Sequence, residues 1–95
     1  MSTAIQILSL DSVATAVSLL HSGETVRITG VGQGAEVTAH DEIPSGHKIA
    51  LKDIGKGEHI LKYGEVIGAA TEDIAAGCWV HVHNCRGVKA RRFED

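Results

Sequence analysis

The sequence predicts a mainly β domain in which glycine turns fold short strands back on one another. A chain of 95 residues forms one domain rather than two. Its 11 glycines separate short segments in which polar and apolar residues alternate, as they do along strands. One pattern, a glycine placed between two aliphatic residues, occurs four times. We therefore expect several short strands and at most one short helix.

The helix candidate is the segment DSVATAVSLLH, residues 11–21. Asp11 or Ser12 could cap a helix that starts there, because both side chains accept hydrogen bonds from free backbone N–H groups. However, Val13, Thr15 and Val17 alternate with other residues and are β-branched, as is typical of strands. The segment therefore fits a strand equally well.

The remaining segments favour strands. A glycine-rich link at 32–34 separates two of them and reads as a hairpin or loop, since no helical run follows it. Polar and apolar residues alternate clearly in HKIALKD and WVHVHN and more loosely in EVIGAATED. The strand-like segments are 26–31, 35–40, 47–53, 65–73 and 79–84.

The recurring glycine pattern predicts one turn type used repeatedly. It reads LHSGETV, IPSGHKI, IGKGEHI and IAAGCWV, at residues 20–26, 43–49, 54–60 and 74–80. The glycine supplies a backbone conformation with positive φ, and the flanking aliphatic residues hold the turn on the core. An acid precedes three of the four copies, at Glu42, Asp53 and Asp73.

Composition and charge exclude several classes of function. The formal net charge of −3 disfavours a nucleic-acid binder, which would present a basic face. The basic residues near the C-terminus are followed by acids, so we expect a polar tail over 88–95. Neither a membrane-spanning run nor an export signal is recognisable, which places the expected protein in the cytoplasm. Cys78 and Cys85 are then expected to be free thiols.

The segment GCWVHVHNCRG, residues 77–87, contains the first candidate site. In a strand, Val80 and Val82 would face the core, while His81 and His83 would project together from the other face with about 6.5–7 Å between their Cα atoms. Two such imidazoles can bind one metal ion or bracket one carboxylate. A half-exposed strand whose polar positions are histidine is the competing explanation. Cys85 could add a third ligand for zinc or iron, but a lone cysteine more often packs as a small apolar residue.

Two further pairs of polar residues lie beside glycines. Lys62 and Tyr63 precede Gly64 and could offer an ammonium and a phenol to an anionic substrate, or could be a solvated lysine beside a tyrosine on a small core. His47 and Lys48 follow a glycine turn, where polar residues are also expected for structural reasons. The residues alone leave both explanations open.

Taken together, the segments resemble a known family. IPSGHKIALKDI, KYGEVIG and WVHVHN are similar to the SAF domain of the altronate and galactarate dehydratase family, and the resemblance runs from about residue 7 to 87. In some members this domain is the N-terminal part of a long enzyme. In others it is a separate small subunit beside a large one, as in the two-subunit sulfolactate sulfo-lyase.

The resemblance implies a fold, a reaction and a set of residues. The fold is a β-clip of folded-over hairpins, here a single SAF domain over 1–95. The reaction is a metal-dependent elimination, with Fe²⁺ or Mn²⁺ that the large subunit could hold. The motif matches imply that His81, His83 and Asn84 line a shared site, the two histidines binding metal or a substrate carboxylate. The residues that it implies for substrate binding are His47, Lys48, Lys62 and Tyr63. Cys85 falls where members vary, which weakens its case as a ligand.

We therefore expect the small subunit of a lyase that removes water, or sulfite, from a sugar acid or a related 2-hydroxy acid. Its partner would be a large catalytic subunit, and the chain alone is expected to be inactive. Exposed strand edges also leave room for pairing with a second copy. The alternative is a non-catalytic SAF module that recognises a small acid or a partner protein. The absence of an export signal favours the lyase subunit.

Overall fold

The computed structural model describes residues 2–31 and 34–87, which form nine strands and no helix. The mainly β class is confirmed, and the helix candidate at 11–21 is a strand with its flanking turns. The expected C-terminal tail, 88–95, lies outside the described residues. The strands are β1 (Ser2–Gln6), β2 (Val13–Ala16), β3 (Thr25–Gly30), β4 (Glu36–Thr38), β5 (Lys48–Ala50), β6 (His59–Lys62), β7 (Glu65–Ala70), β8 (Trp79–Val80) and β9 (Cys85–Gly87).

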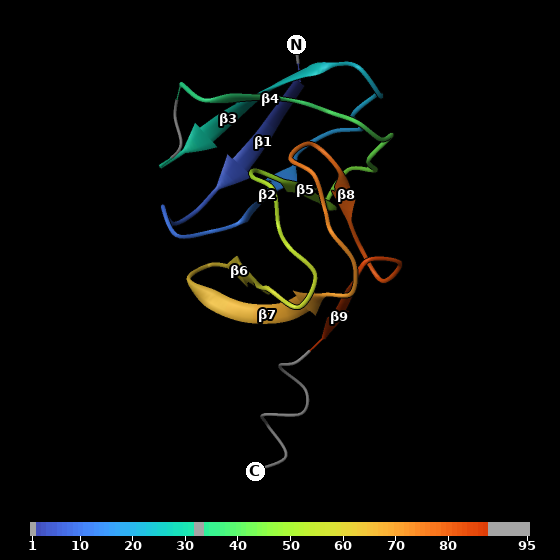
Figure 1. Cartoon of the computed structure of the whole chain (residues 1–95). Helices are drawn as coiled ribbons and strands as arrows, with labels where there is room; N and C mark the ends of the chain where they lie inside the picture. Colours follow the sequence, from blue (N-terminus) through green and yellow to red (C-terminus); the bar gives the residue numbers. More distant parts are fainter. Residues whose placement is uncertain (1, 32–33, 88–95) are drawn as a thin grey trace.

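The strands form two sheets, which Figure 1 shows one above the other. The large sheet has the order β4-β3-β1-β2-β5-β8, and the small sheet has the order β6-β7-β9. β1 pairs with β3 in parallel, while the other neighbours are antiparallel. In the described part of the chain, no helix is long and apolar enough to cross a membrane.

The recurring glycine pattern is longer in the structure than the turn alone. An alanine stands four residues before the first aliphatic residue of every copy, which makes each repeat Ala-x₃-aliphatic-x₂-Gly-x₂-aliphatic. All of these alanines and aliphatic side chains are buried. The four glycines, Gly23, Gly46, Gly57 and Gly77, have φ between 85° and 95°, which residues with a Cβ rarely adopt.

The repeats pair two by two through their backbones. Leu20 and Ile43 exchange N–H···O bonds of 2.8 and 2.9 Å, and Ile54 and Ile74 exchange bonds of 2.7 and 2.8 Å. Each repeat's glycine N–H also donates to the alanine carbonyl of its partner repeat, at 2.7–2.8 Å. The first and second repeats therefore stabilise one half of the domain, and the third and fourth repeats stabilise the other.

The acids that precede the turns have a structural role in the second pair of repeats. Asp53 Oδ1 accepts a hydrogen bond of 2.9 Å from the N–H of Ala76, and Asp73 Oδ1 accepts one of 2.9 Å from the N–H of Lys56. Each acid thus binds the turn of the other repeat. These contacts explain why an aspartate stands directly before the aliphatic residue in both copies.

The large sheet separates two cores. Its first face packs around Ala14 and Ile49 in one cluster, and its second face contributes Val13, Ala50 and Val80 to a cluster with the small sheet. Ile49 and Ala50 are neighbours in β5, so their side chains point to opposite faces. β5 therefore contributes to both cores.

Candidate functional site

The segment expected to be one strand is a strand followed by a turn. β8 ends at Val80, and the N–H of Asn84 donates to the carbonyl of His81 at 3.0 Å to close the turn. Val80 is buried as predicted, but the prediction for Val82 is wrong, because its side chain is 80% exposed at the tip of the turn. His81 and His83 therefore project from a turn and not from one face of a strand.

Asn84 holds this turn from the inside. Its side chain is buried, and its Oδ1 accepts a hydrogen bond of 3.0 Å from the backbone N–H of His81. Its Nδ2 donates to the carbonyl of Trp79 at 2.8 Å. Both polar atoms of the side chain thus have partners within the chain, which gives Asn84 a positioning role beside the histidines.

Three histidines gather around the only tryptophan of the chain, and we call His47, Trp79, His81 and His83 the ring cluster. The imidazole of His81 stacks on Trp79 with 5.2 Å between ring centroids, and that of His83 lies tilted at 5.6 Å. The His47 ring meets the rings of His81 and Trp79 edge-on at 5.0 and 5.4 Å. The structure therefore brings together the three histidines singled out in the sequence.

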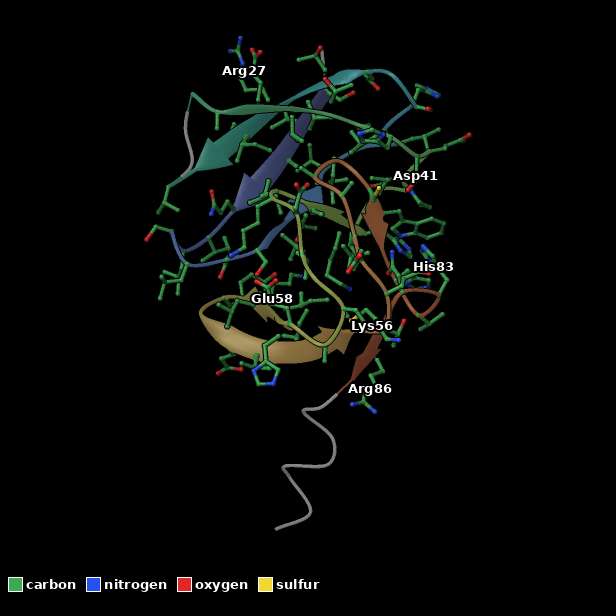
Figure 2. The ribbon with its side chains drawn as sticks, in the orientation of Figure 1. Arg27, Asp41, Lys56, Glu58, His83 and Arg86 are labelled. Carbon is green, nitrogen blue, oxygen red and sulfur yellow. The ribbon has the colours of Figure 1, made fainter. Side chains whose placement is uncertain are left out.

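Trp79 and Asp41 contribute to this arrangement although neither was selected as a candidate site residue. Asp41 Oδ2 accepts a hydrogen bond of 2.9 Å from the backbone N–H of Trp79, and Figure 2 shows Asp41 on the same side of the molecule as His83. Among the described residues, the indole Nε1 is a buried polar atom without a hydrogen-bond partner. The available signal was the position of Trp79, two residues before His81.

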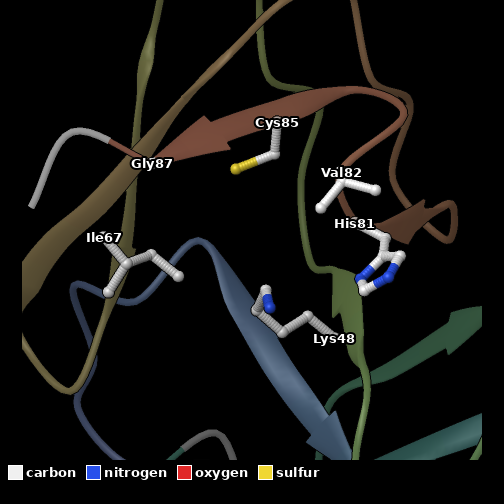
Figure 3. A pocket seen from close by; sticks show the side chains of 6 residues that line it. All are labelled: Lys48, Ile67, His81, Val82, Cys85 and Gly87. Carbon is white, nitrogen blue, oxygen red and sulfur yellow. The ribbon is translucent and has the colours of Figure 1, made fainter. Parts of the chain in front are cut away.

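A pocket of about 240 Å³ lies beside the ring cluster, between the two sheets. Figure 3 shows the side chain of Lys48 reaching its space from β5 and that of His81 from the turn after β8, with Cys85 on a third side. Lys48 and His81 meet here because β5 pairs with β8 and places Lys48 opposite Val80. The residues that line the pocket are Lys48, Ile67, His81, Val82, Cys85 and Gly87.

The charged groups around the pocket influence one another. Partial burial and the neighbouring ammonium of Lys62 lower the pKa of Lys48. Partial removal from water lowers the pKa of His81, and the nearby His47 and Lys48 lower it further. Burial raises the pKa of the Cys85 thiol, which Lys48 partly opposes. The lowered pKa of His81 and the raised pKa of Cys85 favour a neutral imidazole and a neutral thiol beside Lys48 at neutral pH.

The second predicted cluster, Lys62 and Tyr63, adjoins the site without lining the pocket. Tyr63 occupies the two-residue turn between β6 and β7 with a φ of 57°, and its side chain is 54% exposed. The Lys62 Nζ lies 4.9 Å from the centroid of the Tyr63 ring. Buried Asp11 holds this turn, because its Oδ1 accepts a 2.8 Å hydrogen bond from the N–H of Gly64.

The described residues do not form a complete metal site. Among them, no three side chains of His, Cys, Asp or Glu lie together in a way that could hold a metal ion. His81 and His83 lie on the same tryptophan ring, and at most they could supply part of a ligand set. Any metal bound here would need further ligands from outside these residues.

Comparison with known proteins identifies relatives of this chain. Residues 2–88 match the family described as the altronate/galactarate dehydratase SAF domain. Altronate dehydratase of Escherichia coli K12 is 45% identical over 82 residues, which are 86% of this chain and 16% of that protein. The (2R)-sulfolactate sulfo-lyase subunit alpha of Paracoccus pantotrophus is 41% identical over 59 residues, which are 62% of this chain and 88% of that subunit.

A third relative is the galactarate dehydratase (L-threo-forming) of Escherichia coli K12, which is 49% identical over 47 residues, 50% of this chain and 9% of that protein. The chain thus corresponds to a small part of the dehydratases and to most of the sulfo-lyase subunit. The family match covers nearly the whole chain, and the all-strand fold agrees with it. The chain belongs to the altronate/galactarate dehydratase SAF domain family.

Proposed function

We propose that the chain is the small subunit of a metal-dependent lyase that eliminates water, or sulfite, from a sugar acid or a related 2-hydroxy acid. It contributes residues to a site shared with a large catalytic subunit. The observation that carries this proposal is the pocket in which the Lys48 ammonium and the His81 imidazole face the same space. The relatives named as dehydratases and as a sulfo-lyase subunit support the reaction class.

Lys48 is suited to bind the substrate carboxylate. Its ammonium is partly buried in a pocket whose lining includes no acidic residue, and Lys62 adds positive charge nearby. A cation bound to a carboxylate in a partly water-excluded site forms a strong, charge-assisted hydrogen bond. A volume of about 240 Å³ is large enough for a small acid bound through its carboxylate. The end of the substrate remote from the carboxylate would face the partner subunit.

The ring cluster supplies imidazole rings next to this carboxylate. The lowered pKa of His81 keeps its ring neutral at pH 7, so it can donate one hydrogen bond and accept another. Trp79 and Asn84 fix the position of His81 by stacking and by hydrogen bonding. His47 and His83 complete the set of rings that the substrate would meet. Tyr63 would contact a longer substrate from the β6–β7 turn.

The reaction requires a proton to leave the carbon next to the carboxylate while the β-substituent departs. Negative charge then develops on the carboxylate oxygens, and fixed cations and hydrogen-bond donors stabilise it most effectively. Lys48 is placed to provide the cation, and His81 is placed to provide a hydrogen-bond donor. We propose that Fe²⁺ or Mn²⁺ is held mainly by the large subunit, with His81 and His83 as ligands from this chain. When bound, such a cation would further stabilise the charge on those oxygens.

The proposal is tested with a large subunit of the same family. Co-expressed chains should eliminate water from altronate or galactarate, or release sulfite from sulfolactate, while each chain alone should be inactive. Lys48→Met and His81→Ala should each lower kcat/KM at least about 100-fold, since each removes a group acting on developing charge. His59→Gln is the control, because His59 is an exposed histidine on β6 outside the pocket lining. Full activity of a His81→Ala/His83→Ala double variant would contradict the proposed site.

A further inference from the structure

Part of the second face of the large sheet is left uncovered by the small sheet. Ala4, Ala16 and Ile28 point into the first core, so the residues next to them in β1, β2 and β3 point to the opposite face. The small sheet covers that face only where Val13, Ala50 and Val80 pack into the second core. We call the remainder the uncovered face; it consists of Thr3, Ile5, Thr15, Val17, Arg27 and Thr29.

The uncovered face is partly apolar and carries one exposed cation, Arg27. Ile5 is 38% exposed and Val17 is 48% exposed. The two lie diagonally across the β1–β2 pair, because Ile5 pairs with Thr15 and the N–H of Val17 donates to the carbonyl of Thr3. Diagonal neighbours in such a pair are about 7–8 Å apart. The two side chains therefore form one apolar patch.

The sheet register joins this patch to the pocket. Thr15 pairs with Ile5 on one side and with Lys48 on the other. Residues that are directly paired share a face, so the three side chains form one row. Strands lie about 4.8 Å apart, which puts the Cα of Ile5 about 10 Å from that of Lys48. On the other side of the pocket, Val82 presents an apolar side chain that is 80% exposed.

We propose that the large catalytic subunit docks on Ile5, Val17 and Val82, and so spans the pocket and closes it. This inference rests on the proposed function and identifies the surface on which the partner binds. The matched segment is 16% of the E. coli altronate dehydratase, so that relative carries a large amount of additional polypeptide. The sulfo-lyase relative is itself named a subunit. Exposed apolar side chains on both sides of a pocket at the surface are what a covering protein would bury.

A second copy of the same chain fits this surface less well. A symmetric dimer places the same patch of both copies in contact. Across the pocket it would bring Lys48 toward its own counterpart, with Lys62 of each copy nearby. Partial burial and the neighbouring Lys62 already lower the pKa of Lys48, and further like charges would repel its ammonium. The large subunit is therefore the occupant that the charges favour.

The experiment measures association of the full chain with a large subunit of the same family, by light scattering and by titration of one chain with the other. Val17→Glu and Val82→Glu should each weaken binding at least about 10-fold, because a carboxylate would be buried against the partner. Leu10→Glu is the control, since Leu10 is 71% exposed in the β1–β2 connection and lies outside the patch. Thermal unfolding of each isolated variant checks that the fold is retained. At saturating large subunit, the Val17→Glu complex should regain wild-type kcat, because Val17 does not touch substrate.

Two outcomes would overturn the inference. One is binding of the Val17 and Val82 variants as tight as that of the wild type, or an equal loss with Leu10→Glu. The other is a wild-type chain that does not bind the large subunit and instead forms dimers, which the Val17→Glu substitution dissociates. Failure of the proposed function is a different result, in which the two chains bind but none of the three acids is turned over.

Discussion

Replacing Asn84 with alanine should destabilise the domain and release the turn that carries His81 and His83. The change removes the acceptor for the His81 N–H and the donor for the Trp79 carbonyl. A buried polar group left without a partner costs about 1–3 kcal/mol. Asn84 is 5% exposed, but His81 is only half-buried and water can reach part of the turn. We therefore expect a loss of about 2–4 kcal/mol in the free energy of unfolding.

Urea unfolding followed by tryptophan fluorescence is a direct assay, because the chain contains 1 tryptophan and that residue belongs to the ring cluster. With a slope of about 1.5 kcal/mol per molar urea, a loss of ~3 kcal/mol lowers the midpoint by about 2 M. Far-ultraviolet circular dichroism should give the same midpoint if the transition is two-state.

Two further variants make this prediction specific. His83→Ala, at an exposed residue of the same turn, should change the unfolding free energy by less than about 0.5 kcal/mol. Asn84→Asp keeps the acceptor for the His81 N–H but places a carboxylate oxygen against the Trp79 carbonyl. This variant should gain stability as falling pH protonates the new carboxyl. If Asn84→Ala unfolds within about 0.5 kcal/mol of the wild type, the side chain does not hold the turn and the reasoning is wrong.

Three other predictions concern the fold and the charges. Gly77→Ala should destabilise the fold by at least about 3 kcal/mol, since the new Cβ would lie 2.1 Å from a backbone oxygen. Gly23→Ala has nothing within 4 Å of its new Cβ and should lose only about 1 kcal/mol, because of its positive φ. Thermal unfolding of the two variants tests this difference. Lys62→Met should raise the pKa of Lys48, measured by side-chain NMR, and an unchanged value would refute their coupling. His81 should titrate by NMR below its ordinary pKa of 6.5. Stability should then fall as pH drops from 6.5 toward the folded-state pKa, because the unfolded chain binds a proton that the folded chain resists; His81→Gln should remove this part of the slope.

The sequence predicted the β class and the glycine turns because both depend on local patterns. Alternating segments and positive-φ glycines specify strands and turns within a few residues. The reciprocal pairing of the turns was not predictable in this way, since it joins repeats through backbone atoms that any residue possesses. The alanine that begins each repeat was visible in the sequence but lies outside the turn itself, so a search for turns did not include it.

At the candidate site, the alternating pattern led to a wrong prediction for the burial of Val82. WVHVHN alternates as a strand does, yet the buried amide of Asn84 closes a turn after Val80 and sends Val82 into solvent. The encounter of Lys48 with His81 depends on the pairing of β5 with β8, which no local pattern contains. Asp11 is a similar case. We considered it as a helix cap, but it accepts hydrogen bonds from the N–H groups of Leu8 and Gly64 instead.

The position of β5 has a consequence for how the molecule responds to a ligand. Its three residues serve three purposes: Ile49 belongs to the first core, Ala50 to the second, and Lys48 to the pocket wall. Neither half of the domain can separate from the other without losing this strand. Unfolding should therefore be a single cooperative event. An acid bound at Lys48 would then slow hydrogen exchange in the most protected amides of both cores alike, and so report occupancy far from the pocket.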